Sequence, residues 1–186
     1  MLLDIGVGIL AALGIGELLH IPITGWWIAT GILFALLPDI DAIIYFARYR
    51  DMSQEHHHRD LLHIPLLFIP VGTTLLYLFS PALALLFAIC ALVHFIHDSI
   101  GVGWGIQWLR PFNDDHFSFL YLYQPAGKPH LPKRLLYRLE RDKIDEIDAE
   151  FGDHDWIRNV YLRFHPYAIA EYAVFVAALL ALYIAK

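Results

Sequence analysis

Five apolar segments, two pairs of which are separated only by tight polar breaks, most constrain what this chain can fold into. Hydrophobic side chains make up 58% of its 186 residues and charged ones 17%, a balance well above the apolar content of ordinary soluble domains. The segments span residues 2–19, 26–37, 64–79, 82–96 and 168–185. Several are shorter than the roughly 20 residues that a perpendicular membrane span needs, so tilted, partly buried or re-entrant helices are expected. The pattern predicts an all-α membrane protein, a single domain over residues 1–186 with about five membrane-embedded helices.

Two tight breaks and the basic residues predict how these helices are arranged. Proline interrupts the chain at residues 20–25 and 80–81, which indicates two antiparallel helical hairpins. Lys and Arg gather between the second and third segments and again between the fourth and fifth, as is typical of cytoplasmic loops. The end of segment two, the start of segment three and the end of segment four would then open on the same membrane face.

Residues 113–165 form a long connection that we expect to lie at the membrane periphery. Residues 116–123 alternate aromatic side chains at a period of two, which fits either a short strand or an interfacial aromatic belt, with the belt as the default. Residues 133–151 mix charges with apolar residues at helical spacing, as in an amphipathic surface helix.

Overall charge and residue usage narrow the chemistry. The formal net charge of -6 argues against a nucleic-acid partner, because no basic stripe is available to displace counterions from phosphates. Eleven histidines against one cysteine favour imidazole and carboxylate chemistry over disulfides or thiolate metal sites.

The fourth apolar segment ends in a polar run, residues 94–98. At about 100° of helical rotation per residue, His94 and Asp98 lie one above the other, with His97 on the flank. Ionisable groups at the edge of the hydrocarbon are costly unless they face a partner, a cavity or a cation. The run is therefore either a metal-ligand pair or a helix end that meets headgroups and water.

Two further polar clusters fall at the same predicted face. Asp39 and Asp41 follow a proline at the end of the second segment, where an aspartate is also a common helix cap. Because Pro65 is tolerated only in the first turn of a helix, His58 would approach from a loop and His63 from that turn. Together the three clusters offer the carboxylate and imidazole ligands that suit zinc, manganese or iron.

The ordered blocks at residues 36–41, 58–63 and 94–112 resemble the YdjM-like family of membrane-bound metal-dependent hydrolases. The resemblance implies a multi-pass protein of the prokaryotic inner membrane. Family members often carry a histidine near the start of the first helix, where this chain has Asp4, so the resemblance carries a ligand role to Asp4. The usual Gly and Thr of the second block are Asp60 and Leu62 here. The His94 and Asp98 pair in an all-helical setting is also distantly similar to zinc-dependent phospholipase C, which implies phosphoesters as a class.

These observations predict a hydrolase whose metal site lies at the cytoplasmic interface. One or two divalent cations, zinc ahead of manganese or iron, would polarise a phosphoester or a lipid-like substrate. The expected ligands are Asp4, Asp39, Asp41, His58, His63, His94 and Asp98. Asp39 or Asp60 would serve as general base, and Arg59 would either hold an anionic group or pair with Asp60. The alternative is a small transporter or metal carrier, which would gain support if Glu17 and His20 shared a cavity with His94.

Overall fold

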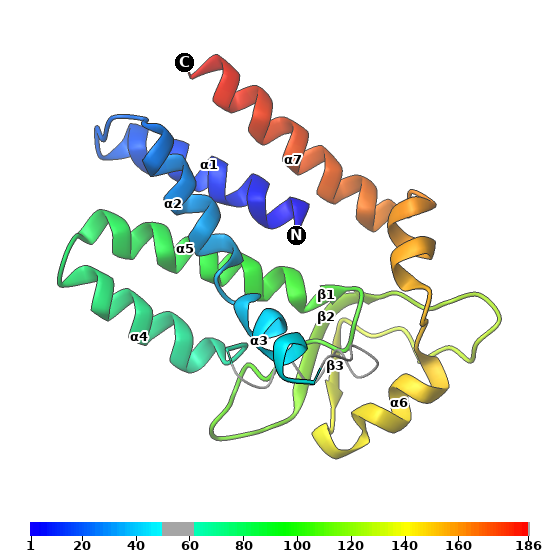
Figure 1. Cartoon of the computed structure of the whole chain (residues 1–186). Coiled ribbons are helices and arrows are strands. Elements are labelled where there is room, and N and C mark those ends of the chain that lie inside the picture. Colours follow the sequence, from blue (N-terminus) through cyan, green and yellow to red (C-terminus); the bar gives the residue numbers. More distant parts are fainter. Residues whose placement is uncertain (50–61, 186) are drawn as a thin grey trace.

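A computed structural model describes residues 1–49 and 62–185 of the chain (Figure 1). Its helices are α1 (Leu2–Leu18), α2 (Gly25–Leu36), α3 (Ile40–Tyr49), α4 (Pro65–Tyr77), α5 (Pro81–Asp98), α6 (Ile144–Phe151) and α7 (Pro166–Ile184). The five predicted apolar segments correspond to α1, α2, α4, α5 and α7, with ends that agree within two residues. Of the described helices, α5 and α7 are long and apolar enough to cross a membrane, whereas α2 and α4 are shorter.

Local sequence determines where these helices begin. Pro65, Pro81 and Pro166 each lie in the first turn of a helix, where a missing backbone N–H leaves no hydrogen bond unmade. The hydroxyl groups of Thr24 and Ser80 accept hydrogen bonds from backbone N–H groups in the first turns of α2 and α5. Both predicted hairpins are thus present, α1 with α2 and α4 with α5.

The hydrophobic core lies between α1, α2 and α5. Ile9, Phe34, Phe87 and Phe95 are buried there, and Phe34 meets Phe87 edge to face at a centroid distance of 5.5 Å. α7 packs along α1 on the other side, while its outer face stays exposed (Figure 1). Packing around α1 therefore brings the first and last helices together.

Glycine sets the spacing between α1 and α2. A Cβ atom added to Gly8 would lie 2.6 Å from the carbonyl oxygen of Gly31, and one added to Gly31 would overlap the carbonyl of Gly8. These neighbours are backbone atoms of two packed helices, which cannot move aside independently.

We therefore expect Gly31→Ala to lower the free energy of unfolding by about 1–3 kcal/mol, the usual cost of overpacking a core. Thermal unfolding of the detergent-purified protein would measure this loss. Gly14→Ala is the matched control, because a Cβ there meets no atom within 4 Å. Equal stability of the two variants would contradict the close approach described here.

The connection after α5 corrects the all-α prediction. It forms a three-stranded sheet in the order β1 (Ile100–Gly101), β2 (His116–Leu122) and β3 (Leu136–Leu139), with β2 parallel to β1 and antiparallel to β3. The aromatic alternation over residues 116–123 is thus a strand rather than a belt. Only the second half of the expected amphipathic helix is helical, as α6, because alternate β3 side chains point into a small core.

This small core and the end of α5 hold the sheet in place. Trp104, Leu122 and Tyr137 are buried together with Leu139 and Ile144. At the end of α5, the Ser99 hydroxyl donates to the Phe95 carbonyl at 2.7 Å and accepts from the Trp108 indole at 2.7 Å. The sheet is therefore fixed directly beside the end of α5, where His94 and Asp98 lie.

Candidate metal centre

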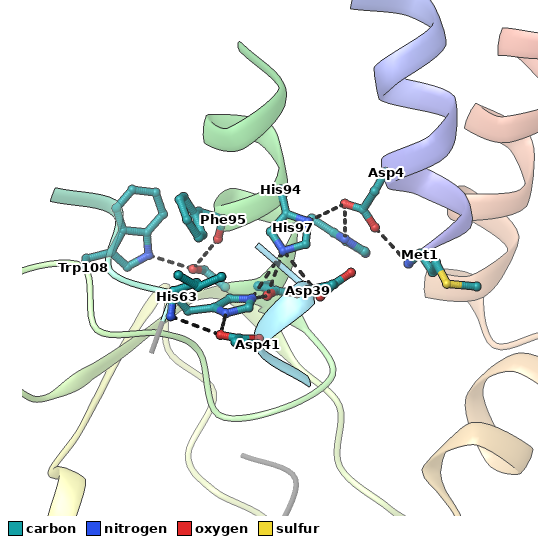
Figure 2. A network of polar contacts seen from close by, with 12 residues as sticks. Met1, Asp4, Asp39, Asp41, His63, His94, Phe95, His97 and Trp108 are labelled. Atoms are coloured by element: carbon teal, nitrogen blue, oxygen red, sulfur yellow. Dashed lines mark hydrogen bonds and ion pairs between the residues drawn. The ribbon is translucent and has the colours of Figure 1, made fainter. Parts of the chain in front are cut away.

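Four side chains from three separate segments converge at one end of the helical bundle (Figure 2). Asp39 lies between α2 and α3, His63 precedes α4, and His94 and Asp98 lie in the last turns of α5. One ligand atom from each falls within 4.8 Å of the other three. The predicted meeting of these three segment ends is confirmed, although α4 begins at Pro65 and so leaves His63 before the helix.

His63 is fully buried and held at both ring nitrogens. Its Nδ1 lies 2.7 Å from Oδ2 of Asp41, which also accepts from the Leu62 backbone N–H at 3.2 Å. Its Nε2 lies 2.9 Å from Oδ2 of Asp98. Asp41 therefore fixes the ring and directs its second nitrogen at the centre of the cluster.

His94 is arranged in the same way. Its Nδ1 faces Oδ1 of Asp4 at 3.2 Å. Its Nε2 lies 3.3 Å from Nε2 of His63, 3.4 Å from Oδ2 of Asp98 and 3.7 Å from Oδ1 of Asp39. Each imidazole thus has a carboxylate behind it and its other nitrogen turned toward the cluster.

This arrangement fits a cation. When Nδ1–H of a neutral imidazole faces a carboxylate, its Nε2 carries a lone pair, so two nitrogens and the Asp98 oxygen meet as three electron-rich atoms. Two nitrogen ligands of one tetrahedral zinc ion, each bound at about 2.0–2.1 Å, lie roughly 3.4 Å apart. The observed 3.3 Å between the Nε2 atoms matches that separation. The donor set and its spacing therefore suit a zinc-like divalent ion.

The electrostatics of the pocket also favour positive charge. Burial alone would lower the pKa of His63, but hydrogen bonds with Asp41 and Asp98 outweigh that effect and raise it. Burial and the charge of Asp98 raise the pKa of Asp39. A proton on His63 and a metal ion would therefore compete for the same position.

A second layer of polar contacts links the cluster to α1 and α7. The His97 ring lies between Oδ1 of Asp4 and Oε1 of Glu171, at 3.2 Å from each. The Tyr161 hydroxyl donates to the same Glu171 oxygen at 2.7 Å, and the Met1 amino group lies 2.8 Å from Oδ2 of Asp4. Sequence reasoning missed Glu171 and Tyr161. Glu171 is the only charged residue in residues 168–185. A single charge in an apolar helix indicates a polar partner, and this was the signal by which the sequence could have identified it.

An open cleft of about 490 Å³ reaches the cluster. Asp39, His97 and Asp98 border it, together with residues of the loops that follow β1 and β2, of α6 and of the segment before α7. Asp39 is the more exposed of the two cluster carboxylates that border the cleft, with 40% of its side chain accessible against 12% for Asp98. A bound molecule would therefore meet Asp39 and Asp98 first.

The remaining predicted site residues occupy three kinds of position. Asp4 and Asp41 lie behind the imidazoles, outside the group of four whose ligand atoms converge. His58, Arg59 and Asp60 lie outside the described residues. Glu17 and His20 are exposed at the opposite end of α1 from Asp4 and do not border the cleft.

A family model described as YdjM inner membrane protein matches residues 4–185, almost the whole chain. No curated protein and no solved structure matches the chain.

Proposed function

Since the chain belongs to the YdjM inner membrane protein family, we propose that this inner membrane protein is a metal-dependent hydrolase acting on phosphoester or lipid-like substrates. The observation that carries the proposal is the approach of the His63 and His94 Nε2 atoms to 3.3 Å, with an Asp98 oxygen beside both. A divalent cation accounts for three nitrogen and oxygen atoms turned toward one point.

His63, His94 and Asp98 would hold the ion, with Asp39 as the fourth ligand or as general base. Zinc is the ion that we expect, with manganese or iron as alternatives. When bound, the ion supplies Lewis-acid polarisation of the scissile ester or phosphoester. Asp41 orients the His63 ring by accepting at Nδ1, and the Asp4 carboxylate faces Nδ1 of His94 at 3.2 Å.

Asp39 is suited to the role of base because it borders the cleft and its pKa is raised toward the range in which a carboxylate accepts a proton effectively. It would take a proton from the attacking water while the buried members of the cluster keep the geometry fixed.

The positions of the helix ends support a membrane placement. We propose that α1, α2, α4, α5 and α7 are embedded in the bilayer and that the cluster lies at the cytoplasmic interface, where it meets lipid headgroups or small molecules. A transporter would need polar groups along the middle of the apolar helices. The exposed positions of Glu17 and His20, away from the cleft, give that alternative no support.

Metal content tests the proposal first. We expect untagged, detergent-purified protein to hold a stoichiometric divalent metal by elemental analysis, and to hydrolyse chromogenic phosphodiesters or carboxylic esters in a reaction that chelation stops. Asp98→Asn should lose both properties. Wild-type protein that takes up neither zinc nor manganese after incubation would overturn the proposal.

A further inference from the structure

We propose that the cleft beside the cluster binds a positively charged ammonium group, so that the substrate is a zwitterionic amphiphile rather than a purely anionic one. This inference rests on the proposed hydrolase function and adds the chemistry of the substrate. It is carried by residues that line the cleft outside the cluster.

Two anchored carboxylates line the cleft outside the cluster. Asp148 accepts a hydrogen bond from the Trp104 indole at 2.8 Å, and Asp153 accepts from the Tyr123 hydroxyl and the Asn159 amide at 2.8 Å each. Burial would raise the pKa of Asp153, but these hydrogen bonds outweigh it and lower the pKa, so the carboxylate stays charged. Both negative charges are thus held in fixed positions on the cleft wall.

Aromatic residues border the same cleft as these carboxylates. Trp104, Tyr123, Trp156 and Tyr167 all border the cleft, together with Tyr161. Indole and phenol faces attract ammonium groups through their quadrupoles, most strongly where water is partly excluded. Carboxylates and aromatic faces in one cleft therefore form a cation-binding wall.

Few cationic groups line the cleft. Among the described residues that border it, none is Lys or Arg, and the two histidines are His97 and His154. The Met1 amino group is engaged by Asp4, His97 lies between Asp4 and Glu171, and His154 is exposed to solvent next to Asp153. The charge of a phosphodiester at the cluster would be neutralised by the bound metal ion. A second anionic group in the cleft would be repelled by Asp148 and Asp153. An ammonium group in that position would be attracted instead.

With the helices embedded as proposed, the cleft opens at the level of the lipid headgroups. Asp4 near the start of α1, Asp98 at the end of α5 and Tyr167 at the start of α7 all border it. Figure 1 shows these three helix ends together beside the sheet. Amphiphiles in the bilayer present their headgroups at this level, so their acyl chains can stay among the apolar helices while the headgroup enters the cleft.

Binding of two short-chain phospholipids tests the inference without any need for turnover. Dihexanoyl phosphatidylethanolamine and dihexanoyl phosphatidylglycerol have the same acyl chains and a phosphodiester. The first carries an ammonium group in its headgroup, and the second carries an uncharged glycerol instead. Tryptophan fluorescence of the full-length protein in non-ionic detergent would report binding, because Trp104 and Trp156 border the cleft. We expect the ethanolamine lipid to bind at least roughly fivefold more tightly.

Two variants make the test specific. Asp148→Asn keeps an acceptor for the Trp104 indole but removes the charge, so the preference should fall severalfold, whereas Asp142→Asn on the exposed surface should not change it. Ile157→Lys places a cation at an exposed position on the cleft wall and should shift the preference toward phosphatidylglycerol.

The outcomes separate this inference from the proposed function. Equal binding of the two lipids, or a preference that neither variant changes, overturns the inference even where metal-dependent hydrolysis is observed. A preference for the ethanolamine lipid that changes as expected in both variants supports the inference. If the protein shows this preference but holds no metal and hydrolyses no substrate, the proposed function is rejected while the inference about ammonium binding stands.

Discussion

Replacing His94 by alanine should abolish stoichiometric metal binding. The ring provides one of the two converging Nε2 atoms, and its removal leaves His63 and two carboxylates without the fourth donor. Removing a residue that hydrogen-bonds a metal ligand lowers metal affinity by roughly 10- to 100-fold. Removing the ligand itself should lower zinc affinity by more than that. Competition with a fluorescent chelator would measure this change, and hydrolysis should be lost with the metal.

The matched control is His116→Ala. His116 is also a buried histidine, but it lies in β2 and its Nδ1 is 3.3 Å from the Gly105 carbonyl oxygen. Any loss of stability common to buried histidines would appear in both variants. Equal loss of metal from both would contradict a site at His94, and retention of metal in His94→Ala would contradict it directly.

Asp41→Asn should weaken metal binding by roughly 10- to 100-fold without abolishing it. Asp41 accepts at Nδ1 of His63, which leaves Nε2 free of a proton and turned toward the cluster. An asparagine at this position can present an N–H instead, which favours the tautomer with a proton on Nε2. The variant should reach full occupancy only at higher zinc concentration, as a chelator titration would show.

Asp115→Asn serves as the control for this variant. Asp115 is a partly buried carboxylate that pairs with Arg138 on the sheet, away from the cluster. The zinc affinity of the Asp115→Asn variant should equal that of the wild type. Unchanged affinity in Asp41→Asn would mean that the orientation of His63 does not depend on Asp41.

The sequence predicted the helices and the cluster well because both depend on local signals. Apolar run lengths and prolines mark the helix ends, and the spacing of His94 and Asp98 places them on one helical face. Burial of His63 beside them followed from the expectation that three segment ends share one membrane face.

The sheet and the second layer of contacts were harder to predict. β3 is only four residues long and mixes charge with apolar residues, so its period of two is easily mistaken for part of a helix. The contacts of Glu171 with His97 and Tyr161 join residues far apart in the sequence, and helical periodicity carries no information about such pairs. The positions of Asp4 and Asp41 behind the rings likewise depend on tertiary packing.

The contact between His97 and Glu171 has a consequence for biosynthesis. Asp4 lies in α1 and Glu171 lies in α7, so Asp4 is synthesised well before Glu171. His97 contacts both, so the polar layer behind the cluster is completed only once α7 has been made and packs beside α1. Until then the nascent chain carries Asp4 and His97 without their partner on α7.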